Sequence, residues 1–64
     1  MSLREVRFFR KFSQYDVALK TGLPQSKISL IENGYTAVKE EEKRKIAKAL
    51  GCKVLEVFPD ETAN

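Results

Sequence analysis

The chain has 64 residues, of which 42% are hydrophobic, and it carries a formal net charge of +3, one cysteine and no histidine. That length suffices for one small domain, and a single cysteine excludes an internal disulfide and with it a disulfide-stabilised secreted miniprotein. Without histidine we expect no zinc site, no cofactor and no Cys/His or Ser/His catalysis, so the sequence does not predict an enzyme. It contains neither a membrane-spanning apolar run nor a signal-peptide pattern, which predicts a cytoplasmic location.

The positive charge is concentrated in one part of the chain. Between Val6 and Lys39 there are six basic residues against two acidic ones. A basic segment fits a polyanionic partner such as nucleic acid. Individual lysines in it serve solubility equally well, so the charge balance alone does not establish that partner.

The first predicted helix follows Ser2 and should end near Lys11. Ser2 and Glu5 have the spacing of a capping box, in which two side chains satisfy free backbone N–H groups at the helix start. On this helix Phe8 points away from the apolar face and Phe9 lies at its border. These two aromatic residues are therefore left over when core positions are assigned.

Two further helices are predicted over residues 14–20 and 25–33, separated by a sharp turn. Ser13 is a good N-cap for the first of them, and Gly22 can adopt the left-handed conformation that ends a helix. Pro24 suits the start of the next helix, where no N–H partner is needed. Two short helices joined in this way form a helix-turn-helix, whose second helix can lie in the DNA major groove. An ordinary helical hairpin is the alternative on these residues alone.

A fourth helix is predicted from Glu40 to Leu50, after a loop over residues 34–39. Its leading glutamates suit the positive end of the helix dipole, and we interpret this charged run as a solvated face. Gly51 is a natural helix stop, and residues 54–58 are long enough for one last helical turn.

The order of these residues resembles the XRE family of phage-repressor and Cro-like helix-turn-helix proteins. The residues that carry the resemblance are Phe12-Ser13-Gln14, Val17-Ala18, Thr21-Gly22, Ile28-Ser29, Ile31-Glu32-Asn33-Gly34 and Lys45 to Gly51. The resemblance implies an all-α, compact five-helix, lambda-repressor-like domain that binds operator DNA, usually as a two-fold dimer. We expect this domain over residues 1–58, with a frayed tail over 59–64.

The resemblance also assigns residues to the DNA backbone. Gln14, at the start of the second helix, matches a residue that contacts a phosphate, and Lys27 and Asn33 match positions near the backbone. For Tyr35, in the following loop, a hydrogen bond to a phosphate and packing over the junction of the third and fourth helices are alternatives.

Three residues of the third helix match positions that face the DNA bases, namely Gln25, Ser26 and Leu30. Gln25 and Ser26 would donate or accept hydrogen bonds at base edges, glutamine favouring adenine. Leu30 is apolar where many relatives carry a polar residue, so contact with a thymine methyl group and a plain surface leucine both remain open.

Two departures from the family pattern predict local weaknesses. Lys11 occupies a turn position where the family usually has glycine, which predicts mild backbone strain. Lys39 stands where the fourth helix usually has a serine or threonine cap, so we expect that end to fray.

The resemblance predicts one ion pair between distant elements. Arg7 and Glu32 match a pair that ties the first helix to the end of the third. Arg7 lies on the core-facing side of its helix and Glu32 follows a core residue, so each is best explained by the other. We predict a partly buried and bidentate contact.

Apolar residues left outside the core predict a contact between two copies of the chain. Leu55 falls on the outward side of the last helical turn, and relatives commonly pair through their C-terminal region. We therefore predict a homodimer centred on Leu55, to which Phe8 or Phe9 contributes.

Together these features predict a sequence-specific regulator of transcription that binds double-stranded DNA, specifically a repressor on a two-fold operator. Other readings stay open from the sequence. One is a protein-interaction module that keeps the fold without binding DNA. Others are an antitoxin-type regulator and a restriction-modification controller.

Overall fold

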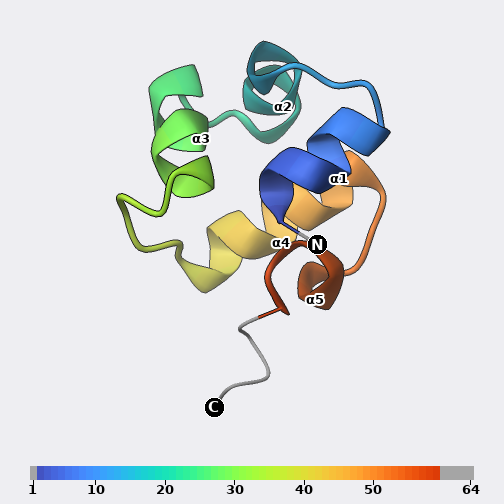
Figure 1. The fold of residues 1–64 in the computed structure, drawn as a ribbon. Coiled ribbons are helices and arrows are strands. Elements are labelled where there is room, and N and C mark those ends of the chain that lie inside the picture. Colours follow the sequence, from blue (N-terminus) through green and yellow to red (C-terminus); the bar gives the residue numbers. More distant parts are fainter. Residues whose placement is uncertain (1, 60–64) are drawn as a thin grey trace.

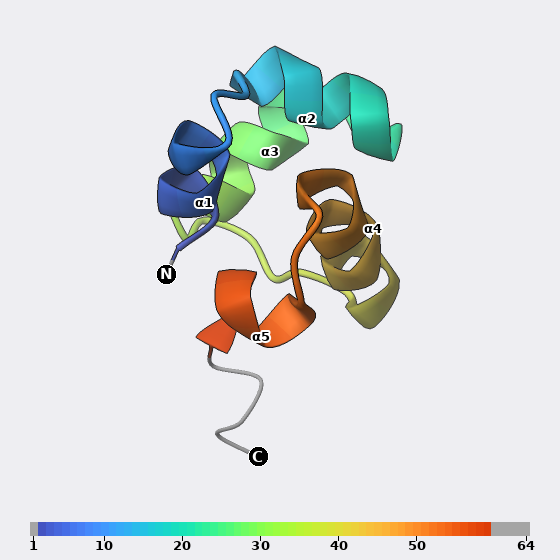
Figure 2. The same ribbon diagram turned by 90° about the vertical axis from the view of Figure 1, so that its right-hand side faces the viewer.

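A computed structural model of the chain describes residues 2–59, which contain five helices and no strand. The helices are α1 (Leu3–Phe9), α2 (Gln14–Thr21), α3 (Gln25–Glu32), α4 (Glu40–Leu50) and α5 (Val54–Val57). Helix α2 packs against both α3 and α4, and α4 packs against α5. In both views α2 lies at one end of the molecule and α5 at the other, with α4 between them (Figures 1 and 2). Of the tail predicted over residues 59–64, residues 60–64 lie outside the described residues.

The first two helices begin as their serine caps predict. The Ser2 hydroxyl accepts a hydrogen bond from the Glu5 N–H at 3.2 Å, and the Glu5 carboxylate accepts the Ser2 N–H at 2.9 Å. Ser13 and Asp16 repeat this arrangement at the start of α2, at 3.0 and 2.8 Å. Each box satisfies two N–H groups that the helix itself leaves without partners, which fixes where the helix begins.

Helix α4 begins at Glu40 without a side-chain cap from Lys39. The Glu42 carboxylate instead accepts the Lys39 N–H at 3.0 Å, which is half of a capping box. This bond opposes the fraying expected at that end. Glu42 also departs from the solvated face predicted for the charged run, because its side chain is only 15% exposed.

The core is formed by aliphatic residues from all five helices. Val17, Ile28, Ile46 and Leu50 are its largest fully buried side chains, and they join α2, α3 and α4. Burying one such side chain stabilises the fold by about 1.5–3 kcal/mol. Helix α2 is thus held on α4, and α3 on α2, by their apolar faces, and the other face of α3 remains outside.

The turn between α1 and α2 contains the strain predicted for Lys11. This residue has a φ of +61°, the one positive value on a non-glycine residue within 2–59. A side chain in that conformation costs about 1–2 kcal/mol. The conformation lets the Phe12 N–H reach the Arg7 carbonyl at 2.9 Å, while the Arg7 guanidinium donates to the Phe12 carbonyl at 2.9 Å.

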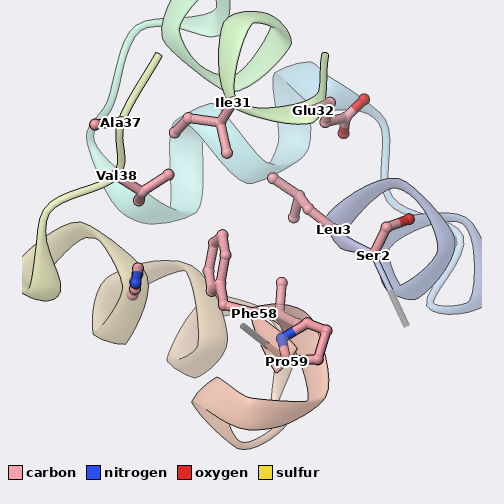
Figure 3. A pocket seen from close by; sticks show the side chains of 10 residues that line it. Ser2, Leu3, Ile31, Glu32, Ala37, Val38, Phe58 and Pro59 are labelled. Carbon is pink, nitrogen blue, oxygen red and sulfur yellow. The ribbon is translucent and has the colours of Figure 1, made fainter. Parts of the chain in front are cut away.

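A pocket of about 500 Å³ opens where α1, the end of α3, the following loop and α5 meet. Leu3, Ile31, Val38 and Phe58 face into it from these four segments (Figure 3). None of the residues predicted to contact DNA lines this pocket. Four of those residues lie instead on α3.

Candidate nucleic-acid interface

The turn between α2 and α3 is fixed by Gly22 and Thr21. Gly22 ends α2 with a φ of +77°, and its N–H donates to the Ala18 carbonyl at 2.8 Å. The Thr21 hydroxyl donates to the Val17 carbonyl at 2.7 Å and accepts the Leu23 N–H at 3.2 Å. Because one hydroxyl bridges both sides of the turn, the direction in which α3 leaves α2 is well determined.

The outer side of α3 presents the residues predicted to face the bases. Gln25 and Ser26 are exposed in its first turn, and Leu30 is 42% exposed. Ser26, Leu30 and Asn33 are separated by four and three residues, so they lie along one face of the helix. The structure therefore brings these three predicted DNA-binding residues together on one accessible face, with Gln25 exposed beside it.

Asn33 and Tyr35 flank the end of α3. The Asn33 side-chain amide donates to the Ser29 carbonyl at 2.8 Å, which closes the last turn of the helix. The Tyr35 N–H donates to the Leu30 carbonyl at 2.9 Å. The Tyr35 side chain is 78% exposed, so the alternative that it packs over the junction of α3 and α4 is wrong. Its hydroxyl is free to reach outward beside α3.

Lys27 is placed differently from the other predicted backbone contacts. Its Nζ lies 3.7 Å from Oε2 of Glu42 on α4, and the Lys27 side chain is only 28% exposed. The hydrogen bond from the Lys39 N–H lowers the pKa of the Glu42 carboxyl. Burial raises this pKa and the charge of Lys27 lowers it, so the net result is a pKa below the usual value. This lysine and this glutamate face each other as charged groups.

Glu32 connects three elements at the other end of α3. Its side chain is fully buried, and the predicted ion pair with Arg7 is present and bidentate, with Nε–Oε2 at 2.6 Å and Nη2–Oε1 at 3.3 Å. Gln14 donates to Oε1 of Glu32 at 3.0 Å, and the Arg4 Nε lies 3.5 Å from the same oxygen. The residue predicted to contact a phosphate, Gln14, is therefore anchored to the end of α3.

These contacts keep Glu32 charged. Burial raises the pKa of the Glu32 carboxyl. The hydrogen bonds from Arg7 and Gln14 and the charge of Arg7 together lower it by more than burial raises it, so the pKa lies below its ordinary value. A buried carboxylate that is paired and hydrogen-bonded is tolerated, whereas an unpaired one is not. The network is thus a rigid support beneath the exposed face of α3.

Comparison with known protein families gives a match to the helix-turn-helix model HTH_3 over residues 3–57. The chain belongs to this XRE-type helix-turn-helix family. The match begins with α1 and ends with α5, so it includes every helix of the described structure. No curated protein and no solved structure shows significant similarity to the chain.

Membership of the helix-turn-helix family makes the chain a DNA-binding regulator and confirms the predicted family and fold. Residues 2–59 include no helix that is long and apolar enough to cross a membrane. Within the same range there is no group of three His, Cys, Asp or Glu residues arranged to hold a metal ion.

Sequence reasoning missed two residues that contact α3 from other helices. Arg4, whose side chain is 60% exposed, adds a second guanidinium to Glu32. Its spacing of three residues from Arg7 places both on one face of α1, and that spacing was a usable signal. Glu42 had no such signal, because its partner Lys27 lies on a different helix and their contact depends on how α3 and α4 pack.

The residues predicted to form a dimer contact are all exposed. Leu55 on α5 is 50% exposed, and Phe8 and Phe9 on α1 are each 78% exposed. Phe8 and Phe9 form a shared apolar surface with Arg4 and Glu5 at its edge. Exposure makes these side chains available for association with a second copy.

Proposed function

We propose that the chain is a sequence-specific repressor of transcription that binds a two-fold DNA operator as a homodimer in the cytoplasm. The observation that carries this proposal is the face of α3, where Ser26, Leu30 and Asn33 are exposed beside Gln25. A helix of this kind fits the major groove, where base edges present distinct patterns of donors and acceptors.

Base recognition would come from the first turn of α3. A glutamine amide can donate to and accept from one adenine, so Gln25 supplies a bidentate reader, and Ser26 adds a hydrogen bond to a neighbouring base. Leu30, one turn further along, supplies an apolar surface for a thymine methyl group. Gln14, Asn33 and Tyr35 would contact phosphates on either side and fix the register of α3 in the groove.

A homodimer follows from the size of the site. One helix-turn-helix contacts one half-site, and a single small module buries too little DNA surface to be highly specific. Two copies related by a two-fold axis would read two half-sites about one helical turn apart. Leu55 on α5 is the residue around which we place the contact. A dimer bound across a promoter would exclude RNA polymerase. In that position the protein would act as a repressor.

Selection of bound duplexes from a random pool tests this proposal. The expected result is an enriched site with two-fold symmetry, bound more tightly than micromolar in low salt. Affinity should fall with salt by a slope of about −0.9 for each phosphate neutralised. Failure to enrich any duplex would refute the proposal and favour a protein-interaction module with the same fold. An enriched site without symmetry would refute the two-fold operator alone.

A further inference from the structure

A cation of α3 is neutralised by an acid from another helix. The Lys27 Nζ on α3 lies 3.7 Å from Oε2 of Glu42 on α4. Both side chains are largely shielded from solvent, at 28% and 15% exposed. An ion pair that is partly withdrawn from water is screened by salt less than a surface pair.

The carboxylate in this pair is held in place by the backbone. Oε1 of Glu42 accepts the Lys39 N–H at 3.0 Å, so one oxygen caps α4 while the other faces Lys27. Glu42 thus stays beside Lys27 as long as α4 begins where it does. Lys39 is the other nearby cation, and its charge also acts on Glu42. The acid is a fixed part of the α3–α4 junction rather than a mobile surface charge.

Such a pair bears directly on DNA affinity. Each phosphate that a lysine neutralises releases counterions, which is the main source of affinity independent of sequence. A lysine already paired with a carboxylate must give up that partner before it can bind a phosphate.

We propose that Glu42 limits the DNA affinity of the chain by holding the ammonium group of Lys27, which is released to a DNA phosphate when the charge of Glu42 is removed. This inference rests on the proposed function, because it concerns how strongly α3 engages DNA. It makes Glu42 a positioning residue that sets the number of cations available to the duplex. In the wild-type chain, Lys27→Ala should therefore change affinity little.

The test compares Glu42→Gln with Glu41→Gln by fluorescence anisotropy on one duplex at several salt concentrations. A glutamine oxygen still accepts the Lys39 N–H, so Glu42→Gln keeps the cap and removes only the charge. Glu41→Gln makes the same change in net charge in the same helical turn, at an exposed position. Circular dichroism of each variant establishes that the helices are retained.

Glu42→Gln should bind more tightly than both Glu41→Gln and wild type, with a salt slope steeper by about 0.9 for one added phosphate contact. Its advantage should shrink about 3.5-fold between 50 and 200 mM salt, following that slope. Addition of Lys27→Ala to Glu42→Gln should abolish the gain.

Three results would overturn the inference. The first is equal binding by Glu42→Gln and Glu41→Gln. The second is a gain that persists when Lys27→Ala is added, since Glu42 would then act on DNA without Lys27. In both cases wild type still binds DNA, so the proposed function survives. Absence of binding by every variant would overturn both proposals.

Discussion

The side-chain amide of Gln14 donates a hydrogen bond to the buried carboxylate of Glu32, with 3.0 Å between Nε2 and Oε1. Arg7 binds the same carboxylate from α1. One acid therefore fixes the start of α2, the end of α3 and the middle of α1 relative to one another. Loss of that acid should affect stability and the geometry of the DNA-binding surface together.

Replacing Glu32 with alanine should destabilise the fold by about 3–5 kcal/mol, because the largely buried Arg7 guanidinium loses its charged partner and keeps only the Phe12 carbonyl. That is a large share of the stability of a domain this small, for which about 3–10 kcal/mol is typical. Urea denaturation followed by circular dichroism measures the change. The control is Glu41→Ala, an exposed glutamate of α4 whose loss should cost no more than about 1 kcal/mol. Equal effects of the two substitutions would contradict a structural role for Glu32.

Stability should fall in acid, and Glu32 should account for part of the fall. Its pKa is lower in the folded chain than in the unfolded chain, so the unfolded state binds more protons as pH decreases. The stabilisation is therefore present above the unfolded value of about 4.3 and is lost as pH falls through the lower folded value. Glu5, Asp16 and Glu42 shift in the same direction.

Comparison with Glu32→Gln separates the contribution of Glu32 from that of the other three carboxyl groups. The variant should be less stable than wild type at neutral pH, and its stability should decline less between pH 6 and 3. Thermal denaturation over that pH range provides the measurement. Parallel pH profiles for the two proteins would show that Glu32 has an ordinary pKa.

Substitution of Lys11 with glycine should stabilise the chain by about 0.5–1 kcal/mol. Glycine removes the cost of a positive φ, while its greater freedom in the unfolded state offsets part of the gain. Lys11→Ala is the matched control, because alanine also lacks the charge but retains the Cβ atom. The midpoint of urea denaturation should rise for glycine only. A rise with alanine would point to the charge of Lys11, not its backbone, as the destabilising feature.

Gln25→Ala should weaken binding to the selected operator by about 1–3 kcal/mol through loss of a base contact. Binding to a scrambled duplex should hardly change, since phosphate contacts carry no sequence information. Competition titrations of both duplexes at one salt concentration give the ratio of the affinities for operator and scrambled duplex directly. An equal loss on both sequences would mean that Gln25 contacts the DNA backbone and that another residue recognises the bases.

Leu55→Glu should abolish dimerisation by placing a charge at the centre of the proposed contact. Sedimentation of wild type and variant, with and without operator, provides the measurement. Leu19→Glu serves as control in the absence of DNA, because Leu19 is a 65% exposed leucine of α2 outside that contact. Normal dimerisation of Leu55→Glu would move the interface to another surface. A wild-type monomer on a palindromic site would exclude the dimer altogether.

The local features of the fold were predictable from the sequence because they depend on residues close together in the chain. The serine caps, the left-handed Gly22 and Gly51, and the bounds of α4 all follow from short-range chemistry. The strain at Lys11 was also predictable, because the resemblance identified a glycine position.

Contacts between helices were harder to predict. The pair of Arg7 with Glu32 was predicted because the resemblance supplied the pairing and both residues flank core positions. The bond from Gln14 to Glu32 and the pair of Lys27 with Glu42 join residues on different helices, and nothing in their spacing reveals the packing that brings them together. The exposed face of α3 was predictable from helical periodicity, whereas the ion pair that neutralises Lys27, the one cation of this helix, was not.

Ser2 and Pro59, the first and last described residues, line the same pocket beside α5. The two ends of the described fold therefore open on one pocket, which the end of α3 also lines, whereas Gln25 and Ser26 at the start of α3 do not line it. Neighbouring ends are what circular permutation and domain fusion need. A short linker could join them beside α5, so the chain could be permuted or fused there without a linker crossing Gln25 and Ser26.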